Sequence, residues 1–127
     1  MKILLDTNFI LTCVKQKIDF ESITNDISDE PIEWIIPQEV LDELRNLKDK
    51  KKIKVKDKNA AKLSLEILKV IKPKIIKLQG RNPNVDIKIV NYISGGEIIL
   101  ATLDKNLKKK VTNKILTIRN KKGLEII

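Results

Sequence analysis

Two aspartates follow short apolar segments near opposite ends of the chain and could act together as metal ligands. Asp6 comes after residues 2–5 and Asp104 shortly after residues 98–101, and both segments have the composition of buried strands. The carboxyl ends of parallel strands meet at one edge of an α/β sheet, so neighbouring strands would bring these carboxylates together. An aspartate before a helix is also a common helix cap, and each position taken alone fits that role.

Glu43 is a third candidate because of its place on a helix predicted from residue 38 to about residue 50. On a helical wheel it falls about 40–60° from Val40 and Leu47, which belong to the apolar stripe. We therefore expect Glu43 at the rim of the buried face, and Glu39, one turn earlier, to be less buried. A carboxylate at such a rim needs a lysine, a metal ion or a water cluster to offset its desolvation.

Asp86 is the fourth candidate and opens a helix predicted over residues 85–94. Asn84 is the expected cap of that helix, and an acid in the first turn complements the helix dipole, so an ordinary structural role is also available. Four gathered carboxylates repel one another and require cations, and Mg²⁺ or Mn²⁺ prefers carboxylate and water oxygens. A metal ion held in this way can activate water and neutralise a phosphoryl transition state.

The charge balance favours a polyanionic partner such as RNA. Lysine and arginine number 26 against 17 aspartate and glutamate residues, which gives a net charge of +9. A solubilising coat of lysines explains the same excess, so charge alone does not separate the two interpretations. The densest charge run, residues 48–59, is predicted to be a solvated loop or a frayed helix end. The candidates for contact with an RNA backbone are Lys51, Lys52, Lys54, Arg81, Lys105 and Lys108.

The scarcity of histidine and cysteine excludes several classes of site. The chain has no histidine, which removes histidine-based zinc sites, histidine general bases and Ser-His-Asp triads. The one cysteine, Cys13, cannot form an internal disulfide and indicates a reducing cytoplasm. We expect no signal peptide, because Asp6 interrupts the apolar start, and no contact with a membrane, because no apolar run approaches the ~20 residues of a membrane span.

Strands are predicted to alternate with helices along the whole chain. The strands are expected at 2–5, 33–36, 74–78, 97–102 and 115–118, with residues 124–127 available as a further edge strand. The helices are expected at about 8–16, 19–28, 38–50, 59–72, 85–94 and 105–110. Thr7 is expected to cap the first helix. This alternation predicts one α/β domain over residues 1–127, with a parallel sheet covered by helices on both faces.

Four segments occur in the order typical of one known family. They read KILLDTNFIL, IPQEVLDELRNL, NVDIKIVNYI and IILATLDKNLKKKV. The chain resembles the PIN-domain ribonucleases, in particular the small archaeal branch related to the eukaryotic pre-ribosomal RNA processing nucleases, and more distantly the VapC toxins. The resemblance implies a three-layer α/β/α fold with a central, mainly parallel five-stranded sheet. It also implies an endonuclease that cleaves single-stranded RNA with Mg²⁺ or Mn²⁺.

The resemblance also assigns roles to individual residues. The four acids of the family match Asp6, Glu43, Asp86 and Asp104, as direct metal ligands or as holders of metal-bound water. Asn8 and Thr102 match the polar residues that orient these carboxylates by hydrogen bonds. The chain departs from many relatives by having Ile87 where they have a second consecutive acid, and Leu103 between Thr102 and Asp104 where they have asparagine.

Other interpretations of the same sequence remain open. The chain could be a toxin held by a small antitoxin, or an inactive PIN fold that binds RNA or a ribosome-assembly protein. A homodimer is also in keeping with the family. A haloacid-dehalogenase-like phosphatase would require a second aspartate where Asn8 stands, and a receiver domain would require an early acidic pair that the chain lacks.

Overall fold

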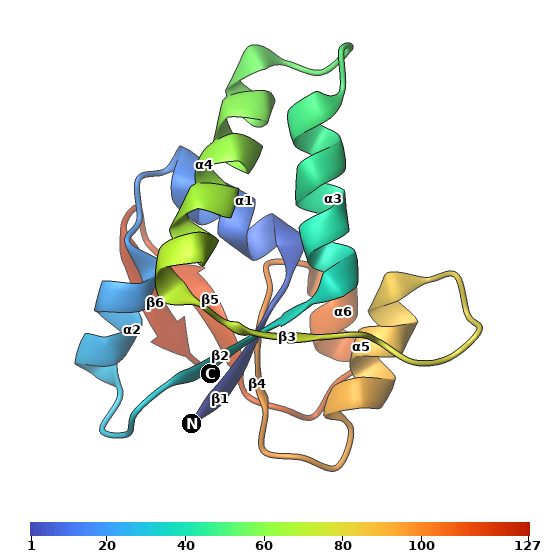
Figure 1. The fold of residues 1–127 in the computed structure, drawn as a ribbon. Coiled ribbons are helices and arrows are strands. Elements are labelled where there is room, and N and C mark those ends of the chain that lie inside the picture. The colour runs from blue at the N-terminus through green and yellow to red at the C-terminus, as the bar shows by residue number, and fades with distance from the viewer.

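A mainly parallel sheet forms the middle layer of the computed structural model, which describes residues 1–127 (Figure 1). Its strands lie in the order β3-β2-β1-β4-β5-β6, with β1 to β5 parallel and β6 antiparallel to β5. The first strand of the chain therefore occupies the centre of the sheet, between β2 and β4. The strands are β1 (Lys2–Leu5), β2 (Glu33–Pro37), β3 (Lys74–Ile76), β4 (Ile99–Ala101), β5 (Ile115–Arg119) and β6 (Gly123–Ile126).

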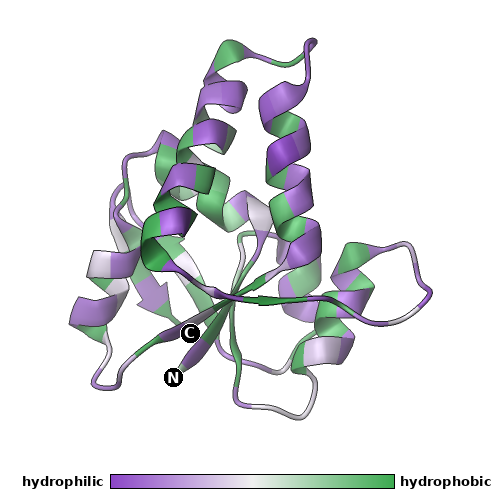
Figure 2. Cartoon of the chain, viewed as in Figure 1, coloured by the Kyte–Doolittle hydropathy of each residue, from purple (hydrophilic) through white to green (hydrophobic).

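Helices cover both faces of the sheet because successive strand residues point to opposite sides. In β1, Ile3 and Leu5 join the larger core with side chains of α1 to α4, whereas Leu4 joins the smaller core with side chains of α5 and α6. Figure 2 shows the inner strands mostly in the colour of hydrophobic residues and the helices banded with hydrophilic ones. The predicted three-layer α/β/α fold is confirmed. The helices are α1 (Thr7–Lys15), α2 (Phe20–Ile27), α3 (Gln38–Asp49), α4 (Val55–Ile71), α5 (Val85–Ile93) and α6 (Lys105–Lys109).

The sheet has six strands rather than the five that the family resemblance implied. A tight turn at residues 120–122 follows β5, and Asn120 takes a left-handed backbone there (φ 60°). Leu124 of β6 is buried in the larger core (7% exposed), so pairing this last segment with β5 also removes apolar surface from water. The further edge strand is therefore present, and it begins one residue before the predicted position.

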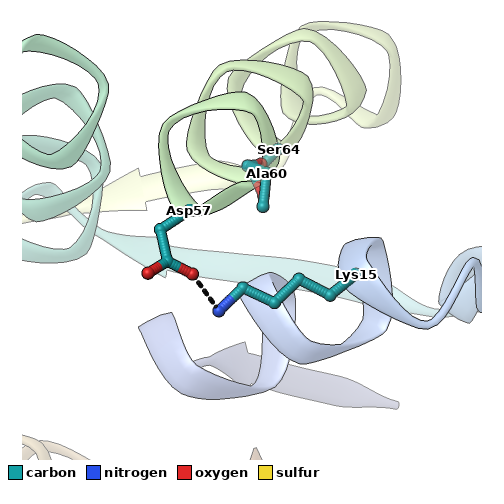
Figure 3. Close-up of polar contacts among 4 residues, drawn as sticks. All are labelled: Lys15, Asp57, Ala60 and Ser64. Carbon is teal, nitrogen blue, oxygen red and sulfur yellow. Dashed lines mark hydrogen bonds and ion pairs between the residues drawn. The ribbon is translucent and has the colours of Figure 1, made fainter. Parts of the chain in front are cut away.

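Helix α4 begins at Val55, four residues before the predicted start, so part of the lysine-rich run is helical. Asp57 in its first turn forms an ion pair with Lys15 at the end of α1 (Figure 3). An acid at this position also complements the helix dipole. Two turns further on, the Ser64 hydroxyl donates to the Ala60 carbonyl oxygen at 2.6 Å, which satisfies a fully buried polar group on the face towards α1 (Figure 3). None of the helices has the length and apolar run that crossing a membrane requires.

Candidate active site at the ends of two central strands

The strand order reverses between β1 and β4, and this reversal defines the crevice in which α/β sheets bind ligands. From β1 the chain builds β2 and β3 on one side, and from β4 it builds β5 and β6 on the other. Asp6 directly follows β1, and Thr102 and Asp104 follow β4. The Asp6 amide also donates to the Ala101 carbonyl oxygen at 3.0 Å, which fixes the backbone of Asp6 against β4.

Both carboxylate oxygens of Asp6 accept hydrogen bonds inside the fold. Oδ1 accepts from the Thr7 amide at 2.9 Å, and Oδ2 accepts from the Thr102 hydroxyl at 2.8 Å. Asp6 is also the cap residue of α1, so the expectation that Thr7 caps this helix was wrong. The short aspartate side chain folds back onto the first helical amide, which places Thr7 inside the helix rather than ahead of it. The Asp6 side chain is only 7% exposed and is held in one orientation.

Thr102 joins the two strand ends through three polar contacts. Its hydroxyl lies 2.8 Å from Asp6 Oδ2 and 3.3 Å from Asn8 Oδ1, and it accepts from the Asp104 amide at 3.2 Å. A hydroxyl carries one proton, and the shorter distance to the charged oxygen favours donation to Asp6. Asn8 makes no hydrogen bond to a carboxylate, contrary to expectation; its Oδ1 instead accepts from the Leu103 amide at 3.0 Å. Asn8 thus fixes the loop after β4.

Helix α3 brings Glu43 to the site through Thr7. The Thr7 hydroxyl donates to Glu43 Oε2 at 2.9 Å, across 36 positions of sequence. The sequence prediction did not include this contact, because Thr7 was assigned to the helix cap. The position of Thr7 next to Asp6, at the end of β1, indicated that Thr7 could belong to the site. Position in the sequence does not show which helix lies opposite Thr7.

The predicted burial of the two glutamates on α3 was reversed. Glu43 is exposed and Glu39 is half-buried, because the inner face of the helix is centred on Val40, Leu41 and Leu44. The wheel argument had used Leu47, which is only half-buried, in place of Leu41. This rotation moves Glu43 away from the core side, while Glu39 Oε1 accepts from the Leu78 amide at 3.3 Å beyond the end of β3.

Asp86 and Asp104 occupy the helix starts that the sequence predicted. Asn84 caps α5 by accepting from the amides of Asp86 and Ile87 at 2.9 and 3.4 Å, which leaves the half-buried Asp86 carboxylate free of the capping role. Asp104 caps α6 itself: its Oδ1 accepts from the amides of Asn106 and Leu107, at 2.8 and 3.2 Å. Only one oxygen of Asp104 is therefore used by the fold.

Burial and neighbouring charge raise the pKa of the Asp6 carboxyl from 3.8 to about 6. Loss of hydration is the main cause, and the negative charges of Asp86 and Glu43 add to it. The hydrogen bonds from Thr102 and Thr7 act in the opposite direction by stabilising the ionised form. Asp6, Glu43 and Asp86 therefore share one electrostatic environment, whereas Asp104 is connected to Asp6 through the hydroxyl of Thr102.

No lysine or arginine forms an ion pair with any of the four candidate acids. All four ion pairs of the protein involve other carboxylates, although the chain has 26 lysine and arginine residues. No three acidic side chains converge closely enough to hold a metal ion by themselves. The donor chemistry nevertheless fits Mg²⁺ or Mn²⁺, because such an ion commonly takes one or two protein carboxylates and completes its coordination with water and substrate phosphate.

The basic residues singled out in the sequence lie in three separate places. Helices α3 and α4 form a hairpin that projects from the sheet, and Lys51, Lys52 and Lys54 lie at its tip (Figure 1). These hairpin-tip lysines are exposed and lie beyond the end of α3, which is itself about 9 Å along the helix axis from Glu43. Arg81 is exposed in the loop before α5. On α6, Lys105 is exposed, while the Lys108 amine donates to the Thr117 hydroxyl at 3.1 Å.

The sequence of the chain matches a known protein family. The family described as PIN like domain matches residues 3–121 of the chain. The chain belongs to this PIN-domain family. The match includes all four candidate acids and ends just before β6, so it spans the whole of the parallel sheet.

Individual relatives agree with this assignment of the PIN domain. Ribonuclease VapC4 of Methanocaldococcus jannaschii is 34% identical over 130 residues, which cover 98% of this chain and 95% of VapC4. The solved structure of the PIN domain endonuclease Utp24 matches with a TM-score of 0.78 and 25% identity, over 98% of this chain and 90% of that chain. VapBC2 from Rickettsia felis, solved bound to a DNA fragment from their promoter, matches with a TM-score of 0.64 and 16% identity, over 94% and 100% of the chains. The last of these supports the fold alone.

Proposed function

We propose that this PIN-domain protein is an endoribonuclease that cleaves single-stranded RNA by phosphodiester hydrolysis with Mg²⁺ or Mn²⁺. The observation that supports the proposal is the environment of the Asp6 carboxylate. This carboxylate is almost fully buried, has a raised pKa, and lies in the electrostatic field of Glu43 and Asp86, and no lysine or arginine forms an ion pair with it. A folded protein tolerates such a group where a bound cation or a reacting group offsets the cost.

The residues of the site have distinct roles in this proposal. Asp6 binds the metal ion with its remaining lone pairs, since each of its oxygens has accepted only one hydrogen bond. Glu43, Asp86 and the free oxygen of Asp104 hold further coordinated water or the ion itself. Thr102 keeps the Asp6 carboxylate in place, and Asn8 fixes the loop that carries Asp104. When bound, the metal ion supplies Lewis-acid stabilisation of the developing charge on phosphate and a water molecule of lowered pKa.

The RNA strand would be held by cations outside the acidic crevice. Lys105 lies at the start of α6, next to Asp104, and Arg81 lies in the loop before the helix that carries Asp86. The hairpin-tip lysines extend the positive surface away from the crevice, and Lys108 contributes in part because one of its protons is used by Thr117. Phosphate contacts of this kind give affinity without sequence preference.

The relatives suggest two biological settings for such a nuclease. Ribosomal RNA processing is our first proposal, on the resemblance of the four sequence segments to the pre-ribosomal RNA processing nucleases; the likeness to the endonuclease Utp24 supports an endonuclease. A toxin that is neutralised by an antitoxin is the second, on the resemblance to the VapC toxins and the likeness to ribonuclease VapC4. The single cysteine agrees with a cytoplasmic setting for both. Growth arrest on expression of the wild type, relieved by Asp6→Asn, supports the toxin; normal growth with altered ribosomal RNA termini supports processing.

Cleavage of a labelled single-stranded RNA tests the enzymatic proposal directly. Wild-type protein should cleave with Mn²⁺ and stop on addition of a chelator, and Asp6→Asn and Glu43→Gln should be inactive. Asp42→Asn is the matched control, since Asp42 is the neighbouring exposed acid on α3 and pairs with Arg45 rather than with the site. Equal cleavage by wild type and Asp6→Asn would refute the proposal, as would a Mn²⁺-soaked crystal structure with the ion away from these acids.

A further inference from the structure

Thr7 is in contact with two of the candidate metal ligands at once. Its backbone amide donates to Asp6 Oδ1 at 2.9 Å, and its side-chain hydroxyl donates to Glu43 Oε2 at 2.9 Å. The residue is 5% exposed, so water does not compete effectively for either donor. Asp6 and Glu43 lie on different elements, and Thr7 is the one residue that hydrogen-bonds to both.

The hydroxyl of Thr7 is free to bind Glu43 because of its position in α1. A threonine inside a helix commonly donates to the carbonyl oxygen one turn earlier. Thr24 of α2 does so, with its hydroxyl 2.6 Å from the Phe20 carbonyl oxygen. Thr7 is the first residue of α1, so no helical carbonyl precedes it by a turn and its proton is available to a neighbouring element.

The position of the Glu43 carboxylate depends on the hydrogen bond from Thr7 more than the position of a buried carboxylate would. The residue is exposed, has no lysine or arginine partner, and lies in the repulsive field of Asp6. Its side chain has several rotatable bonds, and holding it in one geometry costs conformational free energy. Without a donor at Oε2, repulsion from Asp6 and the gain in entropy would both move the Glu43 carboxylate out into solvent. A hydrogen bond to an ionised acceptor is among the stronger neutral-donor contacts.

We propose that Thr7 is a positioning residue that holds the Asp6 and Glu43 carboxylates at the spacing needed to share one divalent ion and its water. The inference rests on the proposed metal-dependent function of this site and assigns a role in it to one further residue. The hydroxyl acts through Glu43 and the amide acts through Asp6, so removing only the hydroxyl should affect only the Glu43 half of the site.

Mn²⁺ binding, measured by the electron paramagnetic resonance signal of the free ion, tests this role without RNA. Thr7→Val preserves the β-branched shape and the amide donor but removes the hydroxyl, and it should weaken Mn²⁺ affinity about 10-fold. Thr7→Ser keeps a hydroxyl and should restore the wild-type affinity. If Thr7→Val does not fold, Thr7→Ala is used in its place, because it removes the same hydroxyl donor. Thr24→Val is the matched control, because it loses an equally buried threonine hydroxyl far from the acids and should bind Mn²⁺ as the wild type does.

The same measurement in the Glu43→Gln background shows whether Thr7 acts through Glu43. There, Thr7→Val should cause no further loss of Mn²⁺ affinity, since the contact that it breaks no longer serves a charged ligand. An equal loss in both backgrounds, or equal weakening by Thr7→Ser, overturns the positioning role. Wild-type affinity in Thr7→Val while Asp6→Asn abolishes binding overturns the role of Thr7 and leaves the proposed function intact. Absence of saturable Mn²⁺ binding by the wild type overturns both.

Discussion

Replacing Asp6 with asparagine should stabilise the metal-free protein at neutral pH and reduce the dependence of its stability on pH. The pKa of Asp6 is raised in the folded state, chiefly by burial, so between pH 3.8 and pH 6 the folded protein binds more protons than the unfolded chain. The free energy of unfolding must then fall as pH rises through this window. The asparagine side chain does not titrate in this range, so Asp6→Asn removes this fall in the free energy of unfolding.

The size of the effect follows from the two pKa values. The difference between 3.8 and about 6, at about 1.36 kcal/mol per pKa unit, lowers stability by about 3 kcal/mol well above pH 6. The same linkage gives a fall of about 1 kcal/mol between pH 5 and pH 7. The hydrogen bonds can survive the substitution, because the new amide group can donate to the Thr102 hydroxyl, which then turns its own proton towards Asn8 Oδ1 at 3.3 Å.

Urea unfolding at pH 5, 6 and 7 in the presence of a chelator measures this difference. Asp57→Asn is the control, because the hydrogen bond from Lys15 lowers the pKa of Asp57 and its contribution is lost only below pH 3.8. The stability of Asp57→Asn should therefore run parallel to that of the wild type over this range. The stability of Asp6→Asn relative to the wild type should increase from pH 5 to pH 7, so that Asp6→Asn is the more stable protein at pH 7. Parallel curves for Asp6→Asn and wild type, or a less stable Asp6→Asn at pH 7, would show that the burial argument is wrong.

Three further predictions concern the supporting residues. Thr102→Val removes the donor to Asp6 Oδ2 and should lower the initial rate of RNA cleavage about 10- to 100-fold, whereas Thr24→Val, which removes an equally buried hydroxyl on α2, should not; equal losses in both would contradict a specific role. Charge reversal of the three hairpin-tip lysines should reduce the slope of log affinity for single-stranded RNA against log salt by about 2, measured by fluorescence anisotropy, and an unchanged slope would exclude them from the RNA contact. The Cys13 thiol is fully buried and burial raises its pKa to about 12, so iodoacetamide at pH 8 should leave it unmodified by mass spectrometry until urea is added; rapid labelling of the native protein would show that α1 opens.

The layers of the fold were predictable from the sequence because short-range patterns determine them. Residues 3–5 of the first strand are apolar throughout, and Pro73 ends the helix before it, as expected. The errors lie where a distant contact decides. Helix α4 begins early because Asp57 pairs with Lys15 of another helix, and β6 exists because Leu124 finds a place in a core formed by residues far from it in sequence.

The candidate site shows the same division between local and distant information. The place of Asp6 and Asp104 after strands, and of Asp86 after an asparagine cap, followed from local pattern. The exposure of Glu43 and its bond to Thr7 depend on the rotation of α3 about its axis, which is set by Leu41 and by what α3 packs against. A helical wheel gives angles between residues of one helix but not the direction in which that helix faces its neighbours.

The central position of β1 means that the crevice can form only after β4 and the loop that follows it have been synthesised. Leu4 pairs with Ile35 on one side and with Leu100 on the other, and the second donor to Asp6 is Thr102. A growing chain that has left the ribosome only as far as α5 has Asp6 and Glu43 but no strand to close the inner edge of β1. Such late, long-range pairing is slow to form. A nascent chain therefore holds no assembled set of carboxylates beside the messenger RNA from which it is being translated.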